Sequence, residues 1–373
     1  MNPEAARLNP GPELYVGLMS GTSLDGVDAA LVEFCANLPR LIATHYSPFP
    51  SRLVSQLLEL QTPGENELHR AALLANELAE IYHQSVRALL EKAAAKPESV
   101  RAIGCHGQTI RHNPRHGYTL QLGNPSLLAE LCGISVVADF RGRDIAAGGQ
   151  GAPLVPAFHD AVFRITDLHR IVLNIGGIAN VTNLAPATAT TGFDCGPGNM
   201  LMDAWIQTHS SLAFDENGSW AATGHAIPSL LQALMGHPFF TEPPPKSCGR
   251  EEFNLSWLTP YLANEYKAED VQATLLELTA DTIARSIRRW CGKPEELVVC
   301  GGGARNTRLM RRLAEHLPDC RVFPSDRIGI GADWMEAMAF AWLARQRLLG
   351  KPGNLPEVTG ARGLRELGAL YPA

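Results

Sequence analysis

The chain has 373 residues, of which 45% are apolar and 19% are charged, and its 32 basic and 38 acidic side chains give a formal charge of -6. A chain of this length usually exceeds what one hydrophobic core can organise, so we expect two domains. The aliphatic content excludes disorder as the dominant state, and an acidic balance without a long Lys or Arg run argues against nucleic acid or a membrane as the main partner.

The eight cysteines are scattered along the chain and include no C-x-x-C pair. In a long, aliphatic-rich chain this pattern indicates buried thiols in a reducing compartment. Residues 1–14 carry acidic side chains and three prolines where a signal peptide needs an apolar stretch. No segment approaches the roughly 18 to 20 apolar residues of a membrane span. We therefore expect a cytoplasmic protein.

Strand-forming residues dominate 15–19 and 27–34, and the polar, glycine-containing SGTSLDG between them predicts a β-hairpin. Apolar residues at helical spacing predict a helix over 65–95, and a strand at 100–105 follows. Next, the sequence predicts a strand, a helix and a strand over 118–122, 126–132 and 134–138, which favours parallel pairing, and then a helix over 156–163.

The same pattern begins again in the second half of the chain. An apolar strand over 171–175 precedes the turn Gly176-Gly177, and a returning strand follows over 180–184. This repetition predicts an α/β protein with two similar domains, 1–168 and 169–373. The other elements expected in the second half are helices over 199–210, 270–290 and 334–349 and a buried strand over 297–300. The last helix has room to cross back over the first domain.

The first turn is the segment most suited to binding phosphate. Its backbone N–H groups and hydroxyls can cradle a phosphate, and Asp25 can hold Mg²⁺ directly or through water. The candidate residues are Gly21, Thr22, Ser23, Leu24, Asp25, Gly26, Val27 and Asp28. The same composition also suits an ordinary hairpin turn.

Two further glycine turns follow strands in the second half. Gly176 and Gly177, together with Asn180, repeat the first arrangement. The predicted strand over 297–300 ends in Gly301, Gly302 and Gly303, where a side chain would obstruct a flat ligand. Three such turns in two similar halves predict one cleft that holds a nucleotide. The sequence contains no G-x-x-x-x-G-K-[ST], no helix-opening G-x-G-x-x-G and no H-R-D signature, which excludes the common phosphate-loop and protein-kinase designs.

Seven segments, in this order and over nearly the whole chain, carry a family resemblance: MSGTSLDGVD, GCHGQTIRHNP, VADFRGRDIAAGGQGAPLVPAFH, NIGGIANVT, GFDCGPGNMLMDAW, CGGGARN and DWMEAMAFAWLA. They closely resemble the 1,6-anhydro-N-acetylmuramic acid kinase family. The resemblance implies the two-domain sugar kinase, Hsp70 and actin fold, in which related sheets flank a cleft for ATP and Mg²⁺. It also implies conversion of the anhydro sugar to N-acetylmuramic acid 6-phosphate in murein recycling, and it suggests a homodimer.

The O6 atom of that sugar is locked in an intramolecular acetal, so water must open the bridge. If water adds at C1 while the C1–O6 bond breaks, O6 leaves as an incipient alkoxide and can capture the γ-phosphoryl group of ATP. One base then suffices, and it deprotonates the water.

Asp194 is the candidate base, because FDCGPGN places a carboxylate at the end of a short strand before a Gly-Pro-Gly bend. By resemblance it occupies the family's catalytic position. The alternative is an Asp that accepts N–H bonds from its own turn. Gly196 and Asn199 of the same segment are candidates for binding the substrate, although Asn199 could be only a helix cap.

Arg143 is the candidate for binding the lactyl carboxylate of the sugar, because Arg grips a planar carboxylate in a bidentate manner. Arg141 is the alternative. Either arginine could instead pair with Asp139 or Asp144.

His106 and Gln108 could hydrogen-bond a sugar hydroxyl or the N-acetyl group, although a lone His is as often structural. Glu336 lies among apolar residues, so its carboxylate needs a partner, and a ligand is one option. Solvent exposure at a helix start is the other.

Two other function classes stay open on the residues alone. Asp139, Asp144 and Asp194 could supply the paired carboxylates of a glycoside hydrolase, but that function leaves the three glycine turns without a role. An ATP-driven clamp like Hsp70 or actin is the second, since a shared fold does not exclude it.

Overall fold

The structure is a computed structural model that describes residues 12–21, 23–35, 38–250 and 252–373. The chain divides into two compact units, Met1–Val162 with Trp334–Ala373, and Phe163–Asp333. The boundary expected after residue 168 therefore differs from this division. The segment from Trp334 onward, which the sequence-based division assigned to the second domain, belongs to the first unit.

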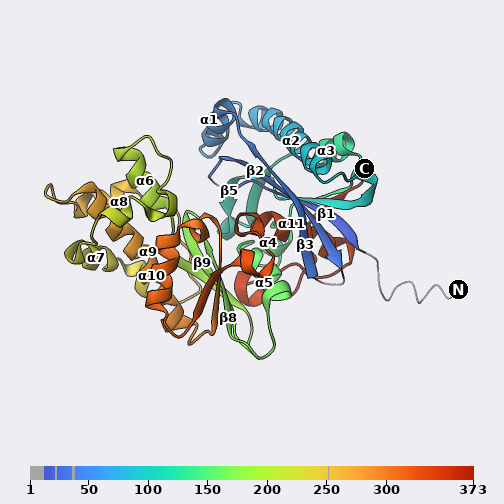
Figure 1. Cartoon of the computed structure of the whole chain (residues 1–373). Helices are drawn as coiled ribbons and strands as arrows, with labels where there is room; N and C mark the ends of the chain where they lie inside the picture. Colours follow the sequence, from blue (N-terminus) through green and yellow to red (C-terminus); the bar gives the residue numbers. More distant parts are fainter. Residues whose placement is uncertain (1–11, 22, 36–37, 251) are drawn as a thin grey trace. The chain divides into compact units, whose positions relative to one another are not determined.

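The first unit is built on a six-stranded mixed sheet with the order β13-β7-β4-β1-β2-β3 (Figure 1). Strands β1, β2 and β3 form an antiparallel meander, and β4 and β7 continue the sheet in parallel. A separate hairpin pairs β5 with β6. The strands are β1 (Glu13–Met19), β2 (Gly26–Cys35), β3 (Leu38–Pro48), β4 (Val100–Cys105), β5 (Gln108–Asn113), β6 (Tyr118–Leu122), β7 (Val136–Ala138) and β13 (Ala369–Tyr371).

Helices cover both faces of this sheet. Successive residues of a strand point to opposite faces, so the apolar residues of β1 need a covering layer on each side. Val16 and Leu18 of β1 belong to the core beneath α2. Gly17 between them faces α11, where an added Cβ would lie 1.8 Å from the carbonyl oxygen of Ala337. The helices are α1 (Ser51–Leu60), α2 (Glu67–Lys92), α3 (Pro125–Cys132), α4 (Gly142–Ala146), α5 (Val155–Phe163), α11 (Met335–Leu348) and α12 (Pro356–Thr359).

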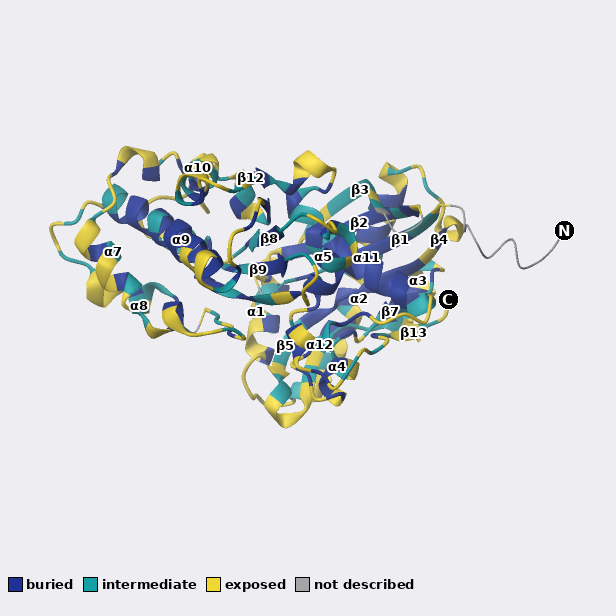
Figure 2. Cartoon of the chain, turned by 90° about the horizontal axis from the view of Figure 1, so that it is seen from below, coloured by how far each residue is buried: buried dark blue, intermediate teal, exposed yellow. Residues whose placement is uncertain are grey.

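The second unit is built on a five-stranded sheet with the order β10-β9-β8-β11-β12. Its longest helix, α9, is buried along most of its length and packs against Ile171, Leu173 and Ile175 of β8 (Figure 2). The strands are β8 (Arg170–Ile175), β9 (Ile178–Leu184), β10 (Thr191–Pro197), β11 (Glu296–Cys300) and β12 (Arg321–Pro324). The helices are α6 (Met200–His209), α7 (Pro228–Met235), α8 (Leu255–Leu258), α9 (Ala268–Trp290) and α10 (Thr307–His316).

Five strands of the first sheet have the same topology as the five strands of the second, and β13 is an addition at the edge of the first sheet. In each unit an antiparallel meander of three strands is followed by two parallel strands, with the orders β3-β2-β1-β4-β7 and β10-β9-β8-β11-β12. This arrangement confirms the expected α/β class and the similarity of the two halves. In the described residues, no helix is long and apolar enough to cross a membrane.

One expected pairing is wrong. The sequence favoured parallel pairing of 118–122 with 134–138, but within the described ranges β6 pairs with β5 alone, and the parallel partner of β7 is β4. The residues after β4 form the separate hairpin of β5 and β6. A tight turn between Asn113 and Tyr118, with Gly117 at a φ of 76°, reverses the chain there. The strand β3 and the helices α1 and α10 were not expected from the sequence.

Candidate active site

The first candidate loop joins β1 to β2 in the first unit. It is held as a turn by the N–H of Leu24, which donates to the carbonyl of Gly21, and Leu24 has a φ of 59°. The hydroxyl of Ser23 donates to the Asp25 carboxylate at 2.6 Å. Ser23 and Asp25 are exposed, so their polar groups are available to a ligand.

The other residues of this loop divide into structural and accessible positions. Leu24 and Val27 are buried in the core, so only their backbone groups can serve a ligand. Gly26 is required by the fold, because an added Cβ would lie 2.3 Å from the carbonyl oxygen of Ser47. Asp28 is half-buried on β2, and Thr22 lies outside the described residues.

Gln108 supports the same loop from β5. Its side chain is fully buried, and its Nε2 donates to the carbonyl of Gly21 at 3.0 Å. Its Oε1 is buried without a hydrogen-bond partner among the described residues. The structure therefore places Gln108 behind the loop, where it positions Gly21.

His106 is a buried, neutral residue. Its Nε2 accepts from the Arg141 guanidinium at 3.0 Å, so Nδ1 carries the proton and donates to the carbonyl of Ser20 at 3.2 Å. Burial, together with the neighbouring Arg141 charge, lowers the pKa of His106 to about 3. The ring also packs against Phe340 at a centroid distance of 4.8 Å.

The two candidate arginines differ in their hydrogen-bond partners. Arg141 donates to His106 and, through Nη1, to the carbonyl of Gly151 at 2.8 Å. Arg143 is exposed on α4 and has no hydrogen-bond or ion-pair partner in the described parts of the chain. Arg143 is thus the arginine with free donors.

Asp144 is a structural anchor. It is fully buried, and its carboxylate accepts from the backbone of Gly151 and from the side chains of Asn354 and Thr359, each at 2.8 Å. These bonds join the 148–151 loop to the segment after α11. A buried carboxylate with all these partners is not available as the acid or base of a glycoside hydrolase.

Glu336 lies in the first turn of α11 and is half-buried. Burial raises the pKa of Glu336, and the charge of Arg141 partly offsets this effect. The solvent-exposed helix start considered from the sequence is therefore wrong for Glu336.

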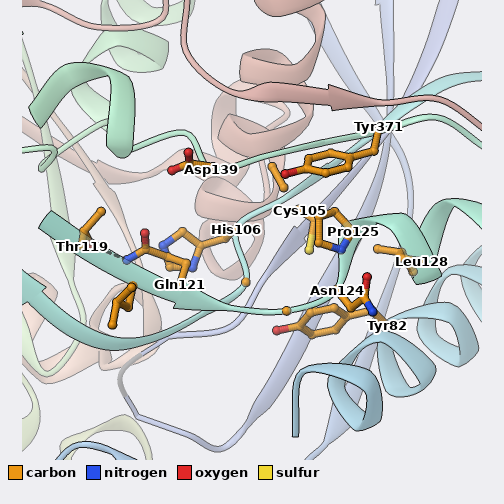
Figure 3. Close-up of a pocket in the computed structure, with 14 residues that line it drawn as sticks. Tyr82, Cys105, His106, Thr119, Gln121, Asn124, Pro125, Leu128, Asp139 and Tyr371 are labelled. Atoms are coloured by element: carbon orange, nitrogen blue, oxygen red, sulfur yellow. Dashed lines mark hydrogen bonds between the residues drawn. The ribbon is translucent and has the colours of Figure 1, made fainter. Parts of the chain in front are cut away.

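A cavity of about 250 Å³ lies in the first unit at the carboxyl ends of β4 and β7. His106, Gln121 and Asp139 contribute polar groups to its lining, and Tyr82 and Tyr371 contribute rings (Figure 3). Burial raises the pKa of Asp139, and a hydrogen bond from the Gly142 N–H partly offsets this increase. Ligands bind at the carboxyl ends of parallel strands in open α/β sheets. No sequence pattern pointed to Gln121, Tyr82 or Tyr371 as residues of such a site.

Asp194, the candidate base from the sequence, belongs to the second unit. It lies within β10, just before a bulge, and not at the strand end expected from the sequence. Its backbone N–H donates to the carbonyl of Lys246, and its carboxylate accepts from the N–H of Cys248 at 3.0 Å. Burial raises the pKa of Asp194 to about 6, although Cys248 and Lys246 each lower it.

Lys246 and Cys248 could not be predicted as neighbours of Asp194, because they lie about 50 residues further along the chain and belong to no recognisable motif. The Lys246 ammonium is turned away from solvent, donates to the carbonyl of Phe239 at 2.8 Å and lies 4.4 Å from the centroid of the Phe239 ring. It supplies a nearby positive charge that favours the ionised form of Asp194.

The glycine turns of the second unit meet beside Asn199. Asn199 directly precedes α6, but its side chain makes no cap; its Nδ2 instead donates to the carbonyl of Ile175 at 3.3 Å. Its backbone N–H donates to the carbonyl of Gly176. An added Cβ on Gly302 would lie 3.6 Å from the same side chain. The cap alternative for Asn199 is therefore wrong.

Polar side chains also form a row across the sheet. Asp194 is paired with Asn180, Asn180 with Asn174, and Asn174 with Cys300, on four adjacent strands. Residues directly opposite one another share a face, so these side chains all lie on the face opposite the α9 core. Asn180 is thus brought beside Asp194.

The strict glycine requirement of the third turn comes from the protein itself. An added Cβ on Gly301, which has a φ of 78°, would lie 2.4 Å from Asn174, and one on Gly303 would lie 2.3 Å from Ile175. Gly196 is similar, because its Cβ would lie 2.7 Å from the Phe240 ring. Gly302 differs, because the described protein atoms leave room for a Cβ there, so the expectation that a ligand excludes a side chain stays a prediction for Gly302.

In the described residues, no group of three or more His, Cys, Asp or Glu side chains could hold a metal ion. Asp25 offers a single exposed carboxylate, which suits Mg²⁺ bound mainly by water and phosphate oxygens.

A family model for anhydro-N-acetylmuramic acid kinase matches residues 13–373. The chain is 55% identical over 361 residues to the anhydro-N-acetylmuramic acid kinase of Nitrosomonas europaea. This alignment covers 96% of this chain and 99% of that protein. It is 56% identical over 365 residues to that of Thiobacillus denitrificans, with coverage of 97% and 98%.

Solved structures show weaker likenesses. The activator of the 2-hydroxyisocaproyl-CoA dehydratase from Clostridium difficile aligns with a TM-score of 0.48 and 14% identity, over 90% of this chain and 96% of that chain. A ROK family glucokinase from Streptomyces griseus aligns with a TM-score of 0.43 and 13% identity, over 89% and 99%. At these scores neither likeness bears on activity.

Proposed function

This chain belongs to the anhydro-N-acetylmuramic acid kinase family, and we propose that it opens the 1,6-anhydro bridge of 1,6-anhydro-N-acetylmuramic acid with water and phosphorylates O6. The products are N-acetylmuramic acid 6-phosphate and ADP. The resemblance stated from the motifs is confirmed, and with it the expectation of a kinase that uses ATP on a small molecule. The finer steps are our proposal.

The observation that carries the proposal is the environment of Asp194. A carboxylate with a pKa of about 6 is ionised at neutral pH and still basic enough to accept a proton from water. The bond from Cys248 engages Oδ2, so Oδ1 is the oxygen that takes the proton. The water oxygen forms a bond to C1, the C1–O6 bond breaks, and O6 bonds the γ-phosphorus while the bond from phosphorus to the β-phosphate oxygen breaks.

The remaining candidate residues have binding roles in this proposal. Ser23 and the backbone of the loop from Gly21 hold phosphate oxygens, and Gly176, Gly177 and Gly302 let the nucleotide approach the backbone. Asp25 would hold Mg²⁺ through water, and that ion neutralises charge on the phosphates when bound.

For the sugar, we assign Arg143 to the lactyl carboxylate, since its donors are free and those of Arg141 are engaged. Polar groups in the cavity of the first unit, including Gln121 and Asp139, would hydrogen-bond the ring and its N-acetyl group. We also propose a role in murein recycling and a cytoplasmic location. We propose further that the chain forms a homodimer, and sedimentation of the purified chain would test this oligomeric state.

The deciding experiment incubates the protein with Mg-ATP and the anhydro sugar in water enriched in ¹⁸O. We expect ADP and a sugar phosphate in equal amounts, with the label in the sugar and none in the phosphoryl group. Sugar opening without ATP would instead indicate a glycoside hydrolase. ADP and free phosphate without a sugar phosphate would indicate an ATP-driven clamp.

A further inference from the structure

A second cavity, of about 330 Å³, opens beside the last turns of α9 in the second unit. Its lining contains three arginines, two threonines and two apolar residues, and none of them has a role in the proposed reaction. They are Met235, Phe240, Thr241, Thr282, Arg285, Arg288 and Arg289. Among the described residues that line it, none carries a carboxylate.

The positive charge in this cavity is only partly compensated. Arg285 donates to the Asp281 carboxylate at 2.8 Å, one turn earlier on the same helix. Arg288 donates from Nη1 to the carbonyl of His316, which is uncharged. Arg289 lies over the Trp290 ring at 4.9 Å and has no hydrogen-bond or ion-pair partner within the described ranges. Two guanidinium groups therefore have no carboxylate partner in the part of the chain that the structure describes.

The other lining residues indicate the kind of anion. The hydroxyls of Thr241 and Thr282 already donate to backbone carbonyls, so the arginines are the available donors. Met235 and Phe240 offer an apolar wall for carbon atoms. A cavity of this size is suited to a small molecule.

We propose that this cavity binds a phosphomonoester of a small polar molecule, with the phosphate on Arg288 and Arg289 and the carbon part against Met235 and Phe240. A phosphomonoester carries about two negative charges, which matches the two uncompensated guanidinium groups, whereas a single carboxylate would leave one. Arginine also matches the geometry of phosphate oxygens with paired N–H donors.

The cavity adjoins the segment that holds the base. Phe240 packs on Gly196, two residues after Asp194, and Lys246 donates to the carbonyl of Phe239. A ligand against Phe240 would therefore contact the 238–248 segment, whose backbone fixes the Asp194 carboxylate. Occupation of the cavity should change turnover without competing with either substrate.

The test measures binding of N-acetylglucosamine 6-phosphate to the full chain by calorimetry, with a non-hydrolysable ATP analogue present to occupy the nucleotide site. We expect saturable binding that Arg289→Gln weakens at least about tenfold, because a charge-assisted hydrogen bond is lost. The double variant Arg288→Gln/Arg289→Gln should abolish it. Arg311→Gln on α10, which removes an exposed arginine outside the cavity, is the matched control.

Further arms separate the possible ligands. Quenching or enhancement of tryptophan fluorescence on binding should disappear in Trp290→Phe, since Arg289 lies over that ring. Inorganic phosphate should bind more weakly than the ester; equal affinity would refute the role of the apolar wall. Equal binding by the wild type and Arg289→Gln, or no saturable binding at millimolar concentration, would overturn the site. No turnover is needed, so failure of this test is separate from failure of the proposed function.

Discussion

The carboxylate of Asp194 accepts a hydrogen bond from the backbone N–H of Cys248 at 3.0 Å. Because Lys246 accepts from the N–H of Asp194 itself, the 246–248 backbone holds this residue at two points. The carboxylate is thereby fixed on one face of β10, with one oxygen engaged and the other available to a water molecule.

Asp194→Asn should lower turnover by about 10²-fold to 10⁴-fold with little change in nucleotide affinity, because the proton acceptor is lost while the shape is kept. Steady-state kinetics and nucleotide titration measure both quantities. Asp203→Asn is the matched control, since burial and the neighbouring Asp215 also raise the pKa of Asp203, to about 7, on α6 of the same unit. Similar losses in both variants would refute the special role of Asp194.

The rate should fall as the pH drops through about 6, because Asp194 then becomes protonated and can no longer accept a proton. A profile of kcat/KM between pH 4.5 and 8 would show an acid limb with an apparent pKa near 6. Lys246→Met should move this limb to higher pH, since the nearby positive charge is removed. A limb that stays near 4 would contradict the buried setting of the carboxylate.

Asp194→Asn should also stabilise the fold at pH 8. The folded-state pKa of about 6 lies above the roughly 3.9 of an unfolded Asp, so the ionised carboxylate costs folding free energy above pH 6 and nothing below about pH 4. The gain should be at most about 2 kcal/mol at pH 8, after allowance for partial solvent screening, and smaller at pH 5. Urea unfolding at both pH values measures it.

Gly302→Ala should fold normally and bind ATP weakly. Its Cβ meets only Asn199, at an ordinary 3.6 Å, whereas the Cβ of Gly303→Ala would lie 2.3 Å from Ile175. Gly303→Ala should therefore lose about 1–3 kcal/mol of stability through overpacking. Thermal unfolding with and without ATP separates the two effects. Unchanged ATP affinity in Gly302→Ala would show that this turn does not contact the nucleotide.

His106 should stay neutral, with its proton on Nδ1, from pH 5 to pH 8, since its pKa is lowered to about 3. The ¹⁵N shifts of its ring in a heteronuclear NMR spectrum should be constant over that range. Arg141→Met removes both the donor to Nε2 and a neighbouring charge, so it should raise the pKa of His106. A ring that titrates near 6.5 in the wild type would refute this arrangement.

Asp144→Ala should lower the free energy of unfolding by about 3 kcal/mol, because three donors lose their acceptor in a buried place. Hydrogen exchange should rise in the 148–151 loop and near Thr359. Asp144→Asn, which keeps one acceptor oxygen, serves as the comparison and should lose less stability. Equal stability of Asp144→Ala and the wild type would exclude the anchor role.

Most strands and long helices followed from local pattern, because hydrophobic spacing and turn residues act over a few positions. The hairpins at SGTSLDG and Gly176-Gly177 and the helix over 65–95 belong to this class. The strand β3 was missed although it pairs along its length with β2, since its polar residues interrupt the alternation that marks a strand. The expected pairing of 118–122 failed because pairing depends on residues distant in the sequence.

The family and the α/β class could be predicted without the fold, because both reside in the order of short motifs and in local periodicity. Asp194 could be selected in the same way, since the chemistry of a carboxylate depends on the residue type. Which candidates have free groups became known from the fold: Arg141 donates to His106, the Asp144 carboxylate is fully hydrogen-bonded in a buried place, and Cys248 and Lys246 contact Asp194. The physical reason is that burial and hydrogen-bond partners set the pKa and availability of a group, and both come from segments far apart in the chain.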